Sequence, residues 1–240
     1  MNVILNSITG FEDAVEAMYF SKRTWTPELH KEVKRVCDTV LCRNGSFRDN
    51  SPNRDIEKFN KWLDMVCKMT KQHITIGKFI DFSFTVVGLH RAGQDDWDAH
   101  AERFDNRIIR NSTRLATYES EKSTYYENKI LTTDEALNIL EINTPETITF
   151  NNKTYVKTVN GYIQEQYADN KDVKRGLYML SIPSNFIFKV NLTQFSHVYK
   201  ERYSGGSANP EVKECAEKCL ELLHDKHSQF NQELMLKIKN

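Results

Sequence analysis

The sequence predicts an α/β (α+β) protein in which a central sheet is flanked by helices. Two observations lead to this prediction. Segments rich in β-branched and aromatic residues, which favour strands, recur along the chain, and segments with apolar residues three or four positions apart, which favour amphipathic helices, lie between them. With 240 residues, 39 % of them hydrophobic, the chain can bury a sizeable core, and we expect one domain over residues 1–240.

The first half of the chain is predicted to be strand, three helices and strand. MNVILNSIT at 1–9 alternates enough to open the fold as a strand. The helical patterns that follow it span 11–25, 26–41 and 53–69. Pro27 suits a first helical position, and the turn-rich RNGSFRDNSP separates the second helix from the third. FIDFSFTVVGL at 79–89 is the clearest strand pattern of the sequence.

The second half begins with a polar, mostly helical stretch at 91–118. Residues 119–174 are irregular, and ETITFNNKTYVKTVNGYI within them predicts a hairpin whose turns are marked by Asn-Asn and Asn-Gly. We interpret this segment as a divergent insertion or a mobile flap. The remaining expected elements are a strand within 176–191, a helix from about 193 to 203, the loop SGGSANP and one uninterrupted amphipathic helix from about 210 to 236.

Charge and composition exclude several classes of protein. The 33 basic residues balance the 33 acidic ones, so no global field attracts nucleic acid or an anionic membrane, and any phosphate binding must be local. No run approaches the roughly 18 apolar residues of a membrane span, and the N-terminal segment has no leader pattern. We therefore expect a cytoplasmic protein without nucleic-acid or membrane partners. Five cysteines, an odd number, favour reduced thiols over a disulfide framework.

Two clusters could be interpreted as metal sites. Cys215, Cys219, His224 and His227 resemble a ligand set, but an uninterrupted helix does not fold four ligands around one zinc ion, so buried thiols are the favoured interpretation. The acidic DDWD at 95–98 points its carboxylates in different directions on a helix, which favours a solvated helix face. We predict no metal site. Phosphate-binding loops, dinucleotide fingerprints, nucleophile elbows and metalloprotease motifs are also absent from the sequence.

Four stretches of the sequence, taken together, resemble one family. They are HITIGKFIDFSFTVVGLHRA at 73–92, NSTR at 111–114, RGLYMLSIPSNFIFKVN at 175–191, and NLTQFSHVYKERYSGGSANPEVKECAEKCLELL at 191–223. In these stretches the chain is similar to the flavin-dependent thymidylate synthases, which reductively methylate deoxyuridine monophosphate (dUMP) at C5. The resemblance does not cover the segment 119–174.

The resemblance implies a nucleotide-binding set made of Ser112, Arg114, Arg175 and Arg202. Ser112 and Arg114 match the Ser-x-Arg that ends the family's signature motif. Arg175 precedes Asn191 by sixteen residues and Arg202 follows it by eleven, the spacings at which the family keeps two nucleotide-binding arginines. The chemistry is coherent, because a guanidinium offers a rigid fork of donors that meets phosphate oxygens and stays charged at physiological pH.

The resemblance also implies a flavin site, in which the expected contacts come from His73, Thr75, His100, Asn191 and His197. This chain departs from the family here. Where the family has Arg-His-Arg, the residues are Ala99, His100 and Ala101, and Arg103, Arg107 or Arg110 is a candidate substitute. Lys78 and Phe79 stand in place of Glu-His, and Thr193 replaces an arginine.

The function implied by the resemblance is conversion of dUMP to dTMP by a homotetramer whose sites lie between subunits. FAD would supply hydride, methylenetetrahydrofolate the carbon, and NADPH would be a co-substrate. Family members use no covalent protein nucleophile, so no catalytic residue is assigned, and the protein's contribution would be positioning and electrostatic activation. Two alternatives stay open: hydroxymethylation or another reaction of a pyrimidine nucleotide such as a cytidine nucleotide, and a catalytically inactive nucleotide-binding protein.

Overall fold

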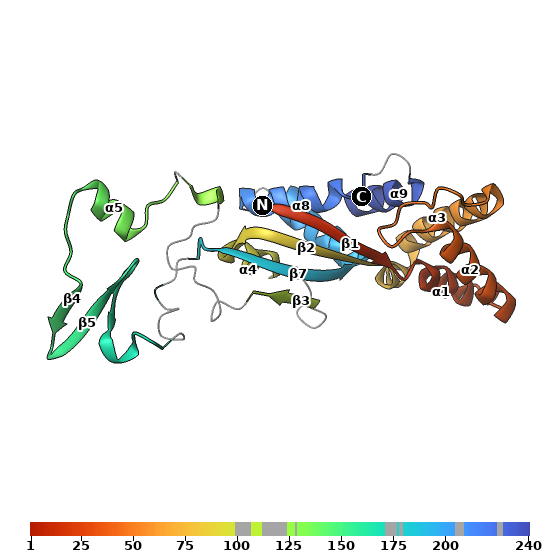
Figure 1. The fold of residues 1–240 in the computed structure, drawn as a ribbon. Helices are drawn as coiled ribbons and strands as arrows, with labels where there is room; N and C mark the ends of the chain where they lie inside the picture. The colour runs from red at the N-terminus through yellow and green to blue at the C-terminus, as the bar shows by residue number, and fades with distance from the viewer. Residues whose placement is uncertain are drawn as a thin grey trace. The chain divides into compact units, whose positions relative to one another are not determined.

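The computed structural model describes residues 1–98, 107–111, 124–127, 129–170, 177, 180–204, 209–224 and 228–240. The chain forms two compact units, which are described separately. The larger unit consists of residues 2–86, 96–109 and 187–240, and the smaller one of residue 1, residues 87–95 and residues 110–186. Figure 1 shows the helices and strands of both units.

The larger unit begins as the sequence predicts, with a strand and three helices. They are β1 (Asn2–Thr9), α1 (Phe11–Ser21), α2 (Pro27–Val40) and α3 (Asn53–Gln72), followed by the 3-10 turn η1 (Ile74–Phe79). Pro27 occupies the first turn of α2, and the hydroxyl of Thr26 accepts a hydrogen bond from the Leu29 amide as its N-cap. Between β1 and α1, Gly10 has a φ of 81°, and a Cβ there would collide with the carbonyl of Phe79. Only glycine lets β1 turn into α1 so close to η1.

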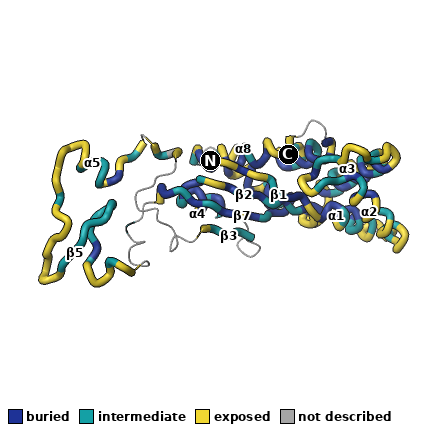
Figure 2. Tube along the Cα trace, viewed as in Figure 1, coloured by how far each residue is buried: buried dark blue, intermediate teal, exposed yellow. Residues whose placement is uncertain are grey.

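A four-stranded sheet forms the centre of the fold, with the strand order β1-β2-β7-β3. The other three strands are β2 (Asp81–His90), β7 (Pro183–Asn191) and β3 (Arg107–Arg110). Alternate residues of β2 and β7 are buried, and Figure 2 shows this burial along both strands. Phe84 stacks on Phe188 with ring centroids 5.2 Å apart. Phe84 also packs against Phe195, and Phe188 packs against Trp97. One face of the sheet therefore carries an aromatic core.

A second aromatic cluster joins helices that are distant in the sequence. Phe11 of α1 lies 4.7 Å from Phe59 of α3 and 5.0 Å from Phe230, measured between ring centroids. Phe230 belongs to α9 (Gln229–Lys239), so this cluster fixes the end of the chain against its first helices. Arg35 of α2 adds a two-bond pair with Asp55 of α3, at 2.7 and 2.8 Å.

The structure corrects two predictions of helix. The stretch 91–118 contains α4 (Arg91–Asp98), but Arg107–Arg110 form the edge strand β3 beside β7. Residues 99–106 and 112–118 lie outside the described part of the chain. The expected helix at 210–236 is two helices, α8 (Pro210–Glu221) and α9. The hydroxyl of Ser228 donates to the carbonyl of Gly45 and accepts from the Asn231 amide, so this N-cap starts a new helix.

The predicted helix near 193–203 divides into two parts. The α-helix α7 (Leu192–Tyr199) continues as a short π-helical segment, η5 (Lys200–Ser204). π-Helical turns are rare and are found frequently at functional sites. The strand predicted within 176–191 begins only at Pro183.

The smaller unit contains most of the segment that no family motif covers. Its strands β4 (Thr147–Phe150), β5 (Lys153–Thr158) and β6 (Gly161–Gln164) form an antiparallel sheet, which confirms the predicted hairpin. Asn151 and Asn152 turn β4 into β5 with φ values of 48° and 58°, the left-handed conformation that favours asparagine. The same unit holds α5 (Thr133–Ile139), η2 (Thr124–Tyr126) and η3 (Glu165–Tyr167).

None of the described helices combines the length and the apolar composition that a membrane span requires.

An ion cluster on the sheet generates a pH-dependent prediction. Burial alone raises the pKa of Asp81, but hydrogen bonds from Arg107, both at 2.8 Å, and from Lys189 outweigh it and leave the pKa below its usual value. A depressed carboxyl pKa stabilises the fold above the unfolded-state pKa of about 3.9, and this contribution is lost as the pH falls through the folded-state pKa.

We therefore expect Asp81→Asn to lower the free energy of unfolding at pH 7, and the deficit to shrink as the pH falls below about 4. Urea denaturation of both proteins between pH 7 and pH 2 measures the difference. A deficit that stays constant over this range would contradict the role given to Asp81.

Candidate functional site

The structure describes five of the predicted site residues. They are Arg202, His73, Thr75, Asn191 and His197. Ser112, Arg114, Arg175 and His100 lie outside the described residues, so the convergence of the three arginines stays a prediction. All five described residues belong to the larger unit.

Arg202 lies within η5, the π-helical extension of α7, and its side chain is only 9 % exposed. Its Nη2 donates a hydrogen bond to the backbone carbonyl of Asp96 in α4, and its Nη1 lies 3.6 Å from Asp96 Oδ1. Its Nε atom is buried and has no hydrogen-bond partner among the residues that the structure describes. A buried arginine that keeps one donor unpaired has capacity for a further acceptor, which an anionic ligand would supply.

A cavity of about 290 Å³ adjoins the start of α7. It lies among the end of α3, η1, α7 and α9, and its polar lining includes Thr193, Ser196, His197, Lys200 and Lys237. Of the predicted flavin contacts, His197 lines this cavity directly. Ile74 also lines it, whereas its sequence neighbours His73 and Thr75 are not among the lining residues.

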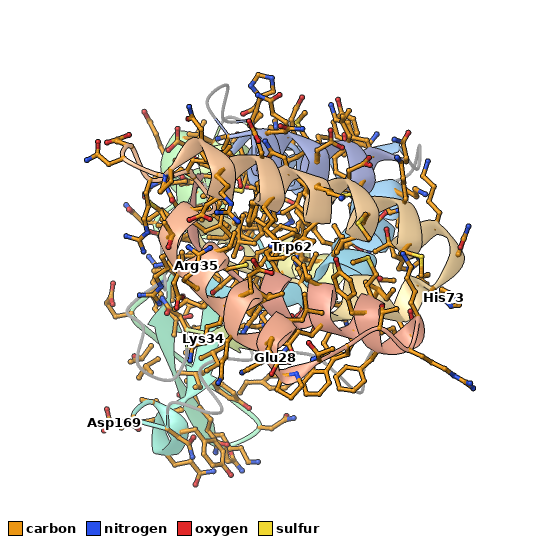
Figure 3. The ribbon with its side chains drawn as sticks, turned by 90° about the vertical axis from the view of Figure 1, so that its right-hand side faces the viewer. Glu28, Lys34, Arg35, Trp62, His73 and Asp169 are labelled. Atoms are coloured by element: carbon orange, nitrogen blue, oxygen red, sulfur yellow. The ribbon has the colours of Figure 1, made fainter. Side chains whose placement is uncertain are left out.

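His73 and Thr75 are exposed. His73 occupies the C-cap position of α3, and Figure 3 shows it at the end of that helix. Asn191 is buried and caps α7, where its side-chain oxygen accepts from the Gln194 amide at 2.9 Å while the Gln194 side chain accepts from the Asn191 amide at 3.1 Å. The side-chain oxygen of Asn191 is therefore used to cap the helix.

Two lysines, Lys200 and Lys237, line the cavity. The pKa of Lys237 is lowered by burial first, and then by the charges of Lys71 and Lys200. A lysine whose charged form is disfavoured by its surroundings gains from a negative partner, because the anion removes the repulsion among the cations.

Gly77 allows the cavity wall to close tightly. A Cβ at Gly77 would lie 2.8 Å from Thr193 Oγ1, and that hydroxyl donates to the carbonyl of Ile74 at 3.1 Å. The glycine therefore lets η1 approach the first turn of α7. The family motifs do not predict this contact, because Gly77 and Thr193 are too far apart in the sequence for any local pattern to connect them.

Sequence reasoning also missed Asp96, Lys200 and Lys237. Asp96 was assigned to a solvated helix face, and its partner Arg202 lies 106 residues away, so no local pattern could connect them. Lys200 and Lys237 come from α7's extension and α9, and only the folded chain places them on one cavity.

The candidate substitutes for the flavin arginines have other partners. Arg107 pairs with Asp81, and Arg110 Nη1 donates to Asp95 Oδ1 at 2.7 Å. Both lie on the strand β3 rather than on a helix face, and Arg103 is outside the described residues. These pairs hold β3 in place, so a flavin role for either arginine would require breaking an ion pair.

The cysteine cluster has the features of a packed core. Cys215 and Cys219 are fully buried on α8, and burial, followed by the hydrogen bond between the two side chains, raises the pKa of Cys219 well above its usual value. The sequence argument against a zinc site assumed one uninterrupted helix through these residues. That assumption is wrong, because α8 ends at Glu221, before His224. Among the described residues, no three His, Cys, Asp or Glu side chains gather as metal ligands; His227 is not described.

Comparisons with known proteins agree with the family resemblance. The family model described as thymidylate synthase complementing protein matches residues 13–227. Two crystal structures of flavin-dependent thymidylate synthase ThyX from Helicobacter pylori, each with FAD and dUMP, are 13 % identical to this chain and superpose with TM-scores of 0.54 and 0.53. Each alignment covers 98 % of this chain and 99 % of the other. At that identity the similarity shows the fold. No curated protein sequence matches the chain.

The strand order, the positions of the motifs along β2, β7 and α7, and the family match over 13–227 lead to one conclusion: this chain belongs to the thymidylate synthase complementing protein family.

Proposed function

We propose that the protein transfers one carbon to C5 of a pyrimidine nucleoside monophosphate, and that its reaction is the reductive methylation of dUMP to dTMP. The observation that carries the proposal is Arg202, a buried guanidinium with one unpaired donor at the position where the family keeps a nucleotide-binding arginine. The H. pylori enzyme of this fold was crystallised with dUMP and FAD, which supports the same substrate and cofactor here.

Four residues form the proposed nucleotide site. Arg114, Arg175 and Arg202 would bind the monophosphate, and Ser112 would add a hydroxyl or backbone donor. Because the chain as a whole is neutral, local guanidinium groups must provide the attraction for phosphate. The protein's part in the reaction would be to orient the uracil ring and polarise it, without a covalent protein nucleophile.

The cavity beside α7 fits part of FAD. Lys200 and Lys237 offer positive charge for a pyrophosphate, and His197 and Thr193 offer hydrogen bonds for a flavin ring or its ribityl chain. Its volume of about 290 Å³ is at the lower end of small-molecule pockets, so the rest of a dinucleotide would extend beyond it. When bound, FAD would supply the hydride; methylenetetrahydrofolate and NADPH are the proposed co-substrates.

We also propose a homotetrameric, cytoplasmic enzyme. Ile109 of β3 and Ile187 of β7 are 78 % and 51 % exposed on neighbouring strands, and apolar side chains of this size are commonly covered at subunit interfaces.

A second candidate keeps the nucleotide site and changes the chemistry. Thr193, Lys78, Ala99 and Ala101 replace the family's charged flavin contacts, which favours an altered redox step, such as hydroxymethylation, or a nucleotide-binding protein without activity. The purified protein separates these cases: flavin absorbance together with dTMP formation supports the methyltransferase, whereas a colourless protein that binds dUMP supports the alternatives.

We expect His197→Ala and Lys237→Ala each to lower the FAD content of the purified protein, because each removes a polar group from the cavity. Absorbance near the flavin band relative to protein absorbance measures the content, and Lys239→Ala, on the same helix, is the matched control. Unchanged flavin content in both variants would place the cofactor elsewhere.

Arg202→Ala should weaken dUMP binding by about 1.5–3 kcal/mol, the range for a hydrogen bond to a charged group. Isothermal titration calorimetry measures the change, and Arg54→Ala, which removes an exposed arginine of α3, serves as control. An unchanged dissociation constant for Arg202→Ala would refute the assignment.

Arg114→Ala and Arg175→Ala should each lose more affinity for dUMP than for deoxyuridine, because the nucleoside lacks the phosphate that the arginine would bind. The two ligands are titrated into each variant under the same salt concentration. Equal losses for both ligands would argue against a phosphate contact.

A further inference from the structure

Asp96 contacts Arg202 through two chemically different groups. Its backbone carbonyl accepts a hydrogen bond from Nη2, whereas its carboxylate Oδ1 lies 3.6 Å from Nη1. A separation of 3.6 Å is too long for a hydrogen bond, so the carboxylate acts on the arginine as a nearby charge. The carbonyl therefore orients the guanidinium, and the side chain balances its charge.

The two partners differ in their access to water. The Arg202 side chain is 9 % exposed, and the Asp96 side chain is 41 % exposed. A buried guanidinium needs a counter-charge, and Asp96 provides one. Because the carboxylate is at the surface and makes no hydrogen bond to the guanidinium, it can turn into solvent when another anion arrives.

From this geometry we infer that the Asp96 carboxylate competes with the nucleotide phosphate for Arg202 and so limits the affinity for monophosphates. The inference rests on the proposed function. An incoming phosphate takes over the role of counter-ion to Arg202, and the adjacent carboxylate repels it. The competition has a use in turnover, because substrate and product carry the same phosphate and a moderate affinity lets the product leave.

The two contacts can be separated experimentally, because Asp96→Asn removes the charge and keeps the backbone carbonyl. We expect this variant to bind dUMP about tenfold more tightly, the order expected when one unit charge about 4 Å from a doubly charged phosphate is removed in a water-like, salt-screened setting. Its affinity for deoxyuridine should not change. A gain confined to the phosphorylated ligand is a result that damage to the fold does not produce.

Two further variants complete the experiment. Asp96→Glu keeps the charge, so its dUMP affinity should stay within about twofold of the native value. Asp64→Asn makes the same change of net charge at an exposed pair with Lys68 on α3, and it should bind dUMP like the native protein. Circular dichroism spectra and calorimetry are recorded for all variants with dUMP and with deoxyuridine.

The outcomes distinguish this inference from the proposed function. If the native protein binds dUMP and Arg202→Ala weakens the binding, but Asp96→Asn binds dUMP equally or more weakly than the native protein, the competition is refuted and the nucleotide site remains. If neither the native protein nor Asp96→Asn binds dUMP, the proposed function itself fails. Tight binding by Asp96→Asn alone supports the competition.

Discussion

A buried guanidinium has to be held and neutralised, and this constraint organises the part of the fold where function is proposed. Arg202 is carried on a π-helical turn that extends α7, and α4 provides both the carbonyl that orients it and the carboxylate that balances it. Two segments that are 106 residues apart are joined by a single side chain. Trp97 anchors α4 in the aromatic core, and its neighbour Asp96 contacts the arginine.

Local pattern was enough to predict much of the fold. β1, α1, α2, α3 and β2 follow from apolar periodicity, from the Pro27 signal and from β-branched runs, and the Asn-Asn turn between β4 and β5 follows from the side chain's tolerance of positive φ. The failures have tertiary causes. RIIR at 107–110 forms a strand because it pairs with the edge of β7. A new helix, α9, begins after α8 because Ser228 caps it while donating a hydrogen bond to the distant Gly45 carbonyl.

The candidate site shows the same division. Motif spacing predicts ligand-binding roles for Arg202, Asn191 and His197, and these roles stay predictions. The partners of these residues could not be identified in this way. Asp96, Lys200, Lys237 and Gly77 acquire their roles only when α4, η1 and α9 pack around α7. Asn191 has a structural role, because its side chain and that of Gln194 form the N-terminal cap of α7.

The capping of α7 by Asn191 has a mechanical consequence. Asn191 ends a strand whose preceding residues are locked into the aromatic core, and it begins the helix that carries both the cavity wall and the arginine turn. The strand and the helix are thereby joined without an intervening loop, so a small rotation of the sheet's aromatic layer would be transmitted to His197 and Arg202 together. Substitutions among Phe186, Phe188 and Phe195 could thus alter ligand affinity from inside the core, at a distance from any group that touches a ligand.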